Sequence, residues 1–159
     1  MEQPGSMMEV RHNDLTGQRH LYALRGFSAD EIIIPFRASE VYEAPTYLTL
    51  QTGINSHIIL DPEILQYCNH SCDPNVFFDT TTMDFVALTA IAPGDELTFF
   101  YPSTEWDMAQ PFACFCGSTQ CLGTISGAAH MHPDTLSRYQ LTDFIREQLK
   151  ARTEALLPA

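Results

Sequence analysis

The chain has 159 residues, a length typical of one domain. Its formal net charge of −12 disfavours direct binding to nucleic-acid backbones but is compatible with attraction of basic peptides. An acidic surface can also serve solubility alone, so both interpretations stay open. No run of about 18 apolar residues marks a membrane span, and residues 1–10 lack the pattern of a signal peptide.

The first half of the chain contains short β-like stretches separated by turn residues. We expect strands at residues 31–35, 47–50, 57–60, 77–78, 84–91 and 97–101, with a turn at 92–95. Many short strands with tight turns predict a mostly β core rather than a parallel α/β sheet. No role is assigned to residues 1–7.

The C-terminal part of the chain has helical spacing instead. Leu141, Phe144, Ile145, Leu149 and Leu156 predict one helix. Thr142 or Asp143 is expected to cap this helix, and Pro158 to end it; residues 134–139 suggest a separate helical turn. A helix packed on the domain is the preferred interpretation, and a partner-binding helix is the alternative.

Five cysteines, an odd number, would leave one thiol over in a secreted disulfide framework. Cys114, Cys116 and Cys121 fall within eight residues, as expected for zinc ligands. Cys72 is the expected fourth ligand of a structural Zn²⁺ site, and Cys68 is its competitor. A metal site of this kind favours a reducing, intracellular compartment, cytoplasmic or nuclear.

Two further segments carry polar and aromatic groups in a defined order. Residues 69–75 read Asn-His-Ser-Cys-Asp-Pro-Asn, and residues 94–101 read Gly-Asp-Glu-Leu-Thr-Phe-Phe-Tyr. Alone, the first segment reads equally well as a turn rich in Asn and Asp. Together with the cysteine run, the segments resemble a SET domain followed by its post-SET zinc segment.

The resemblance implies a fold and an activity. SET domains are small curved β-sheets (a β-clip-like fold) in which the two segments cross as a pseudoknot. They are S-adenosylmethionine-dependent protein lysine methyltransferases. The implied substrate is a lysine amine in a histone or another basic protein, with neither nucleic acid nor membrane as a direct partner, and the oligomeric state is left open.

The resemblance also implies residue roles. Tyr101 would lie beside the transferred methyl group and the cofactor, which Asn69 and His70 would also contact. Phe115 would lie near the adenine. The remaining implied residues are the metal ligands Cys72, Cys114, Cys116 and Cys121, Phe99 and Tyr47 in the substrate channel, and Arg19 in the cofactor turn.

Phe99 is associated with room for higher methylation states. Phe77, Phe78 and Phe100 are further candidates for channel walls, with plain core packing as the alternative. Trp106 is expected to cover the zinc segment or to stack on the cofactor.

The family pattern is incomplete in several places, two of which bear on function. Gly17 has no second glycine after it, because Arg19 or His20 replaces it, and the segment between Tyr47 and Leu65 is short. These departures keep two alternatives open: a non-catalytic binding module and an enzyme that acts on a small molecule.

The expected organisation follows from the motifs. An N-terminal extension (1–17) precedes the SET core (18–104), the post-SET zinc segment (105–127) and a C-terminal helical segment (128–159).

Overall fold

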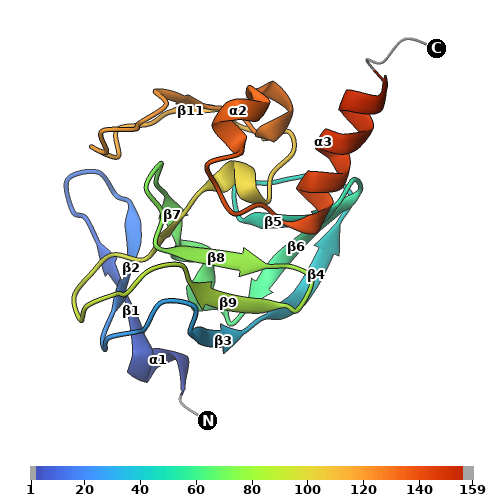
Figure 1. Cartoon of the computed structure of the whole chain (residues 1–159). Helices are drawn as coiled ribbons and strands as arrows, with labels where there is room; N and C mark the ends of the chain where they lie inside the picture. Colours follow the sequence, from blue (N-terminus) through green and yellow to red (C-terminus); the bar gives the residue numbers. More distant parts are fainter. Residues whose placement is uncertain (1–2, 156–159) are drawn as a thin grey trace.

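The computed structural model describes residues 3–155, whose strands form five small sheets (Figure 1). The strands are β1 (Met8–His12), β2 (Arg19–Ala23), β3 (Ile32–Pro35), β4 (Arg37–Tyr42), β5 (Thr49–Gly53), β6 (Ser56–Asp61), β7 (Asn69–His70), β8 (Val76–Asp79), β9 (Asp84–Ala87), β10 (Thr98–Phe99), β11 (Phe112–Ala113) and β12 (Thr124–Ile125). The helices are α1 (Pro4–Met7), α2 (Pro133–Leu136) and α3 (Asp143–Ala155), with 3-10 turns η1 (Glu63–Tyr67), η2 (Tyr101–Ser103) and η3 (Ala128–His130).

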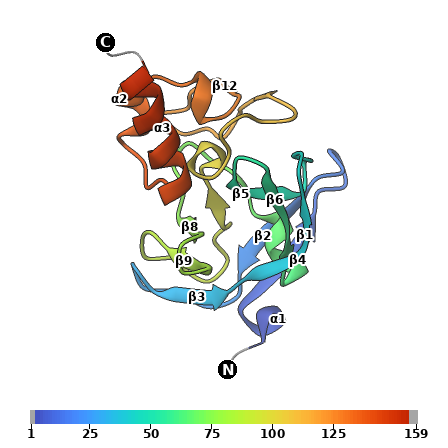
Figure 2. The same ribbon diagram turned by 90° about the vertical axis from the view of Figure 1, so that its right-hand side faces the viewer.

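The sheets are mainly antiparallel, which confirms the expected mostly β fold. Their orders are β1-β2, β3-β9-β8, β4-β6-β5, β11-β12 and β10-β7, and only the last pair is parallel within the described residues. Figure 2 shows α2, α3 and β12 together at one end of the molecule, opposite α1. The chain after residue 104 therefore packs as a layer on the β core.

Several predicted strands differ from the structure in length. The stretch expected at 47–50 begins only at Thr49, and the one expected to reach Ile91 ends at Ala87. The strand expected at 97–101 is reduced to Thr98–Phe99, because the chain turns into η2 at Tyr101. Pro102 in this turn has no N–H to donate to a sheet.

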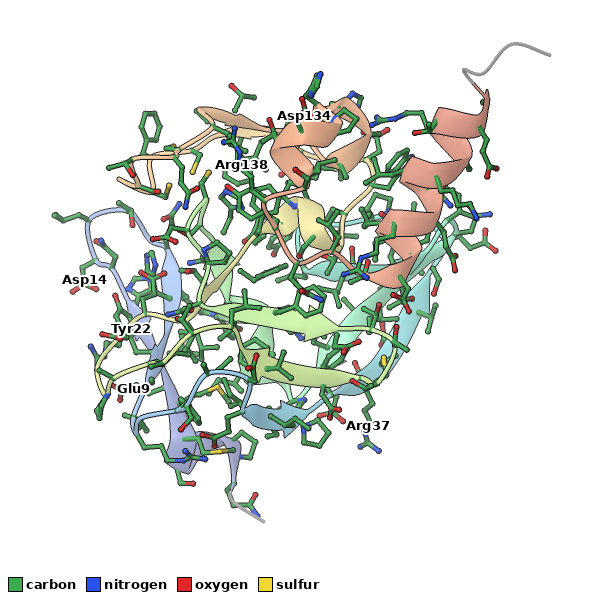
Figure 3. All side chains as sticks on the ribbon, viewed as in Figure 1. Glu9, Asp14, Tyr22, Arg37, Asp134 and Arg138 are labelled. Carbon is green, nitrogen blue, oxygen red and sulfur yellow. The ribbon has the colours of Figure 1, made fainter. Side chains whose placement is uncertain are left out.

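The hairpin β1-β2 and the strand β4 were not predicted. β4 is almost fully exposed and carries no apolar alternation, so the period-two signal is missing. Figure 3 shows Glu9 and Tyr22, cross-strand partners in the hairpin, with Asp14 in the loop between the strands. Met7, for which no role was expected, is buried in the main core.

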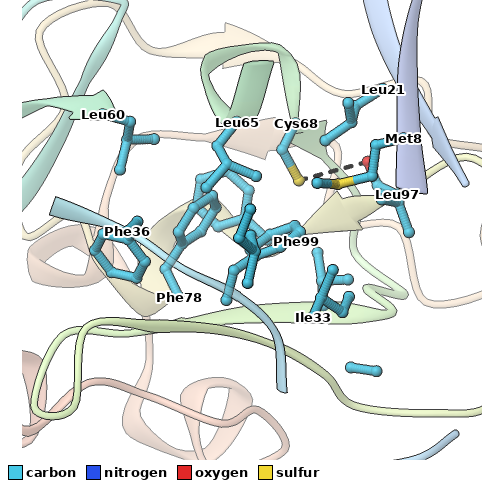
Figure 4. Close-up of a cluster of buried hydrophobic side chains, with 14 of the residues drawn as sticks. Met8, Leu21, Ile33, Phe36, Leu60, Leu65, Cys68, Phe78, Leu97 and Phe99 are labelled. Atoms are coloured by element: carbon cyan, nitrogen blue, oxygen red, sulfur yellow. Dashed lines mark hydrogen bonds between the residues drawn. The ribbon is translucent and has the colours of Figure 1, made fainter. Parts of the chain in front are cut away.

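The main core lies between the hairpin and the three-stranded sheets (Figure 4). Phe78 packs at its centre, with ring centroids 4.7 Å from Phe85 and 4.8 Å from Phe99. Edge-to-face and tilted aromatic pairs at these distances add stability beyond their buried area. The core therefore holds β8, β9 and β10 against one another.

A second hydrophobic core joins the C-terminal segment to the β core. Its buried members are Phe100, Ala128, Leu136, Leu141 and Ile145. The rings of Phe100 and Tyr139 stack with centroids 3.6 Å apart. This packing favours the interpretation of α3 as a helix of the domain.

The start of α3 agrees with the sequence prediction. Thr142 accepts a hydrogen bond from the backbone N–H of Ile145 at 3.4 Å, as an N-terminal cap does. Leu156 and Pro158, expected to continue and end the helix, lie outside the described residues.

Gly127 allows the C-terminal segment to pack closely against the loop that contains Trp106. Gly127 has a φ of +106°, and a Cβ atom there would lie 2.6 Å from the carbonyl oxygen of Trp106. Glycine alone combines that backbone geometry with so close an approach. The chain can thus pass directly from β12 into η3 beneath the loop that follows η2.

Candidate active site and metal centre

The segments around β7 and β10 lie side by side although about 30 residues separate them in sequence. Beyond the parallel strand pair, the N–H of Ser71 donates to the carbonyl of Phe99 at 3.0 Å. The side chain of Asn75 accepts from the N–H of Thr98 and donates to the carbonyl of Glu96. Backbone and side-chain bonds together fix the register of these crossing segments.

His70 connects the crossing to the cysteines. Its Nδ1 accepts a hydrogen bond from the N–H of Tyr101 at 3.0 Å, and its Nε2 lies 3.4 Å from Sγ of Cys72. Burial lowers the pKa of His70 to about 4, so the ring is neutral near pH 7. Because Nδ1 accepts, the proton belongs on Nε2, which donates toward the sulfur.

Four cysteines from two distant parts of the chain meet beside this histidine. The sulfur atoms of Cys72, Cys114, Cys116 and Cys121 all lie within 4.8 Å of one another. Sγ of Cys72 is 4.0 Å from Sγ of Cys114, too far for a disulfide. Tetrahedral zinc with Zn–S bonds of about 2.3 Å places its sulfurs about 3.8 Å apart, so this donor set fits a structural zinc ion.

The chain around the cluster supports that role. The N–H of Leu122 donates to Sγ of Cys72 at 3.3 Å, a contact that stabilises thiolate charge. The hydroxyl of Tyr139 donates to the carbonyl of Cys72 at 2.8 Å. Four sulfur donors complete a tetrahedral shell, which is typical of a structural rather than a catalytic metal.

Cys68, the competitor for the fourth position, is not part of the cluster. It is buried in the main core, with Sγ 3.4 Å from the carbonyl oxygen of Leu97 (Figure 4). Burial raises the pKa of its thiol well above the ordinary value. Cys68 therefore behaves as a small apolar side chain.

A cleft of about 1110 Å³ opens between the hairpin, the crossing segments and the cysteine cluster. It brings together all seven residues expected to bind cofactor or substrate: Arg19, Tyr47, Asn69, His70, Phe99, Tyr101 and Phe115. Phe115 and Tyr47 are 92% and 83% exposed, so each side chain is free to cover a bound molecule.

The turn that lacks the second family glycine borders the same cleft. Gly17 has a φ of +73°, and Gln18, Arg19 and His20 follow it along the edge of the cleft. The guanidinium of Arg19 donates to the hydroxyl of Tyr67 at 3.1 Å. The carbonyl of Arg19 accepts from the Asn69 side chain at 2.7 Å, which ties the hairpin to the crossing segments.

The other expected aromatic walls are core residues. Phe77, Phe78 and Phe100 are buried and do not line the cleft, whereas Phe99 and Tyr101 do. Trp106 packs in the second core, with the Arg152 guanidinium 5.5 Å above its ring. Trp106 is not among the side chains packed on the cysteine cluster or lining this cleft, so neither expected role for it is supported.

Tyr101 and Phe99 contribute neighbouring aromatic rings to the cleft. Their ring centroids are 4.8 Å apart. Burial raises the pKa of the Tyr101 phenol well above its ordinary value, so the hydroxyl keeps its proton. Among the hydrogen bonds of residues 3–155, none involves the Tyr101 hydroxyl.

Glu105 is a cleft residue that the sequence analysis missed. Its Oε2 accepts from the N–H of Gln51 at 3.0 Å and from the hydroxyl of Thr104 at 2.5 Å. Burial raises the pKa of Glu105 to about 7, although both hydrogen bonds act in the opposite direction. No motif marked it; the only signal was an acidic residue four positions after Tyr101.

The fold and the crossing segments define a known class of protein. The chain belongs to the SET domain family, whose model matches residues 18–102. Enzymes of this family use S-adenosylmethionine as methyl donor, and the four-cysteine cluster is consistent with a post-SET zinc segment.

Relatives of this chain differ in their sequence identity and in the length over which they align with it. Methyltransferase flvH of Aspergillus flavus is 47% identical over 116 residues, which cover 71% of this chain and 64% of that protein. The histone-lysine N-methyltransferase, H3 lysine-36 specific, of Schizosaccharomyces pombe is 30% identical over 114 residues, or 68% of this chain and 14% of that protein. The chain thus spans less than two thirds of the length of either relative.

A solved structure shares the fold. KRYPTONITE in complex with mCHG DNA and SAH aligns with a TM-score of 0.54 and 20% identity over 74% of this chain and 28% of that one. Within residues 3–155 no helix has the length and apolar character needed to cross a membrane.

Proposed function

We propose that the protein transfers a methyl group from S-adenosylmethionine to the amine of a lysine side chain in a histone or another basic protein. The observation that carries this proposal is that Asn69, His70 and Tyr101, from the two crossing segments, line the same cleft. Asn69, His70 and Phe115 would hold the donor, with Arg19 at the edge of the cleft. Tyr101 would lie at the reacting atoms, and Phe99 and Tyr47 along the lysine.

The aromatic side chains in the cleft support this chemistry because the attacking amine must be neutral. Lysine has an ordinary pKa of about 10.4, so its deprotonation at pH 7 costs about 4–5 kcal/mol. Apolar side chains such as Phe99 disfavour the ammonium form and lower that cost. Alignment of the amine with the methyl group would supply most of the remaining rate acceleration.

The proposed organisation assigns each segment one task. Residues 18–104 would form the catalytic SET core, with 1–17 as an N-terminal extension. Residues 105–127 would hold zinc and cover the donor, and 128–159 would support that cover. When bound, zinc would hold the two cysteine segments together and take no part in methyl transfer.

Methylation of a small amine is the second candidate. Only a two-residue turn joins β5 and β6, so this part of the chain adds little to a peptide-binding groove. The relative most identical among those described above is named only as a methyltransferase. The third possibility, a non-catalytic module, predicts that the donor does not bind.

Replacement of the central tyrosine tests catalysis. We expect Tyr101→Phe to bind S-adenosylmethionine as the wild type does in calorimetry, and to lose methyl transfer by about 100-fold or more. The reason is that the hydroxyl acts only near the reacting atoms. A panel of lysine peptides and small primary and secondary amines, read by mass spectrometry, separates the first two candidates. Absence of donor binding at millimolar concentration would favour the non-catalytic module.

A further inference from the structure

One oxygen of Glu105 is left without a protein partner. Oε2 accepts both hydrogen bonds described above, whereas Oε1 has no hydrogen bond among residues 3–155. The residue is partly exposed and lines the same cleft as Phe99 and Tyr101. The carboxylate is therefore held in place through one oxygen, while the other has no hydrogen-bond partner among residues 3–155.

The neighbouring elements hold Glu105 rigidly. Its backbone N–H donates to the carbonyl of Tyr101 at 3.0 Å, and its carbonyl accepts from the N–H of Ala128 at 2.9 Å. The side chain of Gln51 accepts from the N–H of Trp106 at 2.8 Å, so Gln51 of β5 is hydrogen-bonded to two adjacent residues of this loop, Glu105 and Trp106. A group fixed in this way suits a role that demands orientation.

Within residues 3–155, Glu105 forms no ion pair, and the guanidinium of Arg152 lies over the neighbouring Trp106 and donates to the carbonyls of Ala129 and Met131. The titratable groups on the elements around it are the Tyr101 phenol on η2, His57 on β6, and the pair formed by Asp107 and His130. Burial lowers the pKa of His57, which favours its neutral form. Asp107 lies 2.8 Å from His130, so each has the other as its partner.

We propose that Oε1 of Glu105 binds the ammonium group of the incoming amine and takes its proton before methyl transfer. This inference rests on the proposed function and names its substrate class, a cationic amine. A partly buried carboxylate without a cation has a desolvation cost, and an ammonium group offsets that cost. The pKa of about 7 for this carboxyl suits a group that accepts a proton near neutral pH.

The steps balance in protons and electrons. The N–H bond of the ammonium breaks, and its proton passes to Oε1 of Glu105. The nitrogen lone pair forms the new N–C bond with the methyl carbon, while the C–S bond electrons of S-adenosylmethionine go to sulfur. The products are the methylated ammonium and S-adenosylhomocysteine, and Glu105 then releases its proton to water.

Glu105→Gln tests this role because the amide keeps an oxygen for Gln51 and Thr104 but accepts no proton. At pH 7 we expect kcat to fall about 100-fold with unchanged donor affinity. In the wild type, kcat/KM should be level from about pH 7 to 10. In the variant it should rise tenfold per pH unit across that range, because only solution supplies the neutral amine.

Asp107→Asn is the matched control, because it makes the same change two residues away and outside the cleft. It should keep the level pH profile of the wild type. A Glu105→Gln variant that keeps this profile, or that loses the same factor at every pH, would overturn proton acceptance.

Binding without turnover separates this inference from the proposed function. With S-adenosylhomocysteine present, we expect the wild type to bind N-acetyl-lysine methylamide at least tenfold more tightly than its norleucine analogue in NMR titrations. Glu105→Gln should lose that preference. No preference in the wild type would overturn ammonium binding by Glu105. A preference without methylation of any amine would instead overturn the proposed methyl transfer.

Discussion

His70 acts on two parts of the molecule through its two ring nitrogens. One holds the backbone of Tyr101 and the other donates toward Cys72, so a single side chain aligns the crossing segments with the cysteine cluster. The motif Asn-His-Ser-Cys-Asp-Pro-Asn marked His70 as important. It did not reveal that the ring is neutral, because that state depends on burial by residues far away in sequence.

Phe99 provides a prediction about product. It is 7% exposed, and its ring lies 4.8 Å from those of Phe78 and Tyr101. We expect Phe99→Tyr to shift the products toward monomethylation, because the added hydroxyl and its water would fill space needed by a methylated amine. Overpacking should also cost about 1–3 kcal/mol of stability. Mass spectrometry of the products and denaturant melts measure the two effects.

Phe77→Tyr serves as the control for this change. Phe77 is 5% exposed and lies outside the cleft, so its variant should lose stability while keeping the product distribution. Equal product shifts in both variants would refute a local role for Phe99.

At the scale of elements, β7 and β10 pair in parallel and β11 pairs with β12 beside the cysteines. The sequence motifs predicted that these segments meet, but not how short the strands are. Two-residue strands carry almost no periodic signal. Their positions depend on contacts made elsewhere, such as the Tyr139 hydroxyl bond to the carbonyl of Cys72.

The cysteine cluster yields a prediction about the post-SET segment. We expect Cys116→Ser to lower bound zinc from about one ion per chain toward zero, and to weaken S-adenosylmethionine binding at least tenfold. The reason is that metal binding and local folding are coupled. Elemental analysis and calorimetry measure the two effects, and a chelator should reproduce them in the wild type.

Cys68→Ala is the matched control, because Cys68 is buried outside the cluster. It should keep its zinc and lose about 1 kcal/mol of stability through the cavity left by the sulfur. Zinc loss in Cys68→Ala, or full zinc retention in Cys116→Ser, would contradict the assignment of ligands.

At the scale of the whole molecule, Glu105 links stability to pH. The ordinary pKa of glutamate is 4.5, and the folded state raises that of Glu105 to about 7. Between these values the folded protein binds more protons than the unfolded chain, so the free energy of unfolding falls as pH rises. The stabilisation that Glu105 adds to the folded state is fully present below about pH 4.5 and is lost as the pH rises through 7. It amounts to at most about 3 kcal/mol.

Comparison with Glu105→Gln isolates this effect. The wild type should lose up to about 3 kcal/mol relative to the variant between pH 5 and 8, since groups common to both chains cancel. Urea melts at a series of pH values measure the difference, with Asp107→Asn as control. A wild-type-to-variant difference that does not change with pH would show that Glu105 titrates as an exposed carboxyl.

The amino-acid sequence by itself determined the mostly β class and a metal site built on Cys114, Cys116 and Cys121, because these features depend on residue types at fixed spacing. The crossing of the two segments was implied by the resemblance of their motifs to the SET family. The sequence also predicted that Thr142 or Asp143 caps α3, and the structure shows that Thr142 does so. Only the tertiary structure decided that Cys72 rather than Cys68 joins the cluster, that Phe100 stacks on Tyr139, and that Glu105 enters the cleft. Each of these outcomes depends on contacts between residues distant in sequence, which no local pattern encodes.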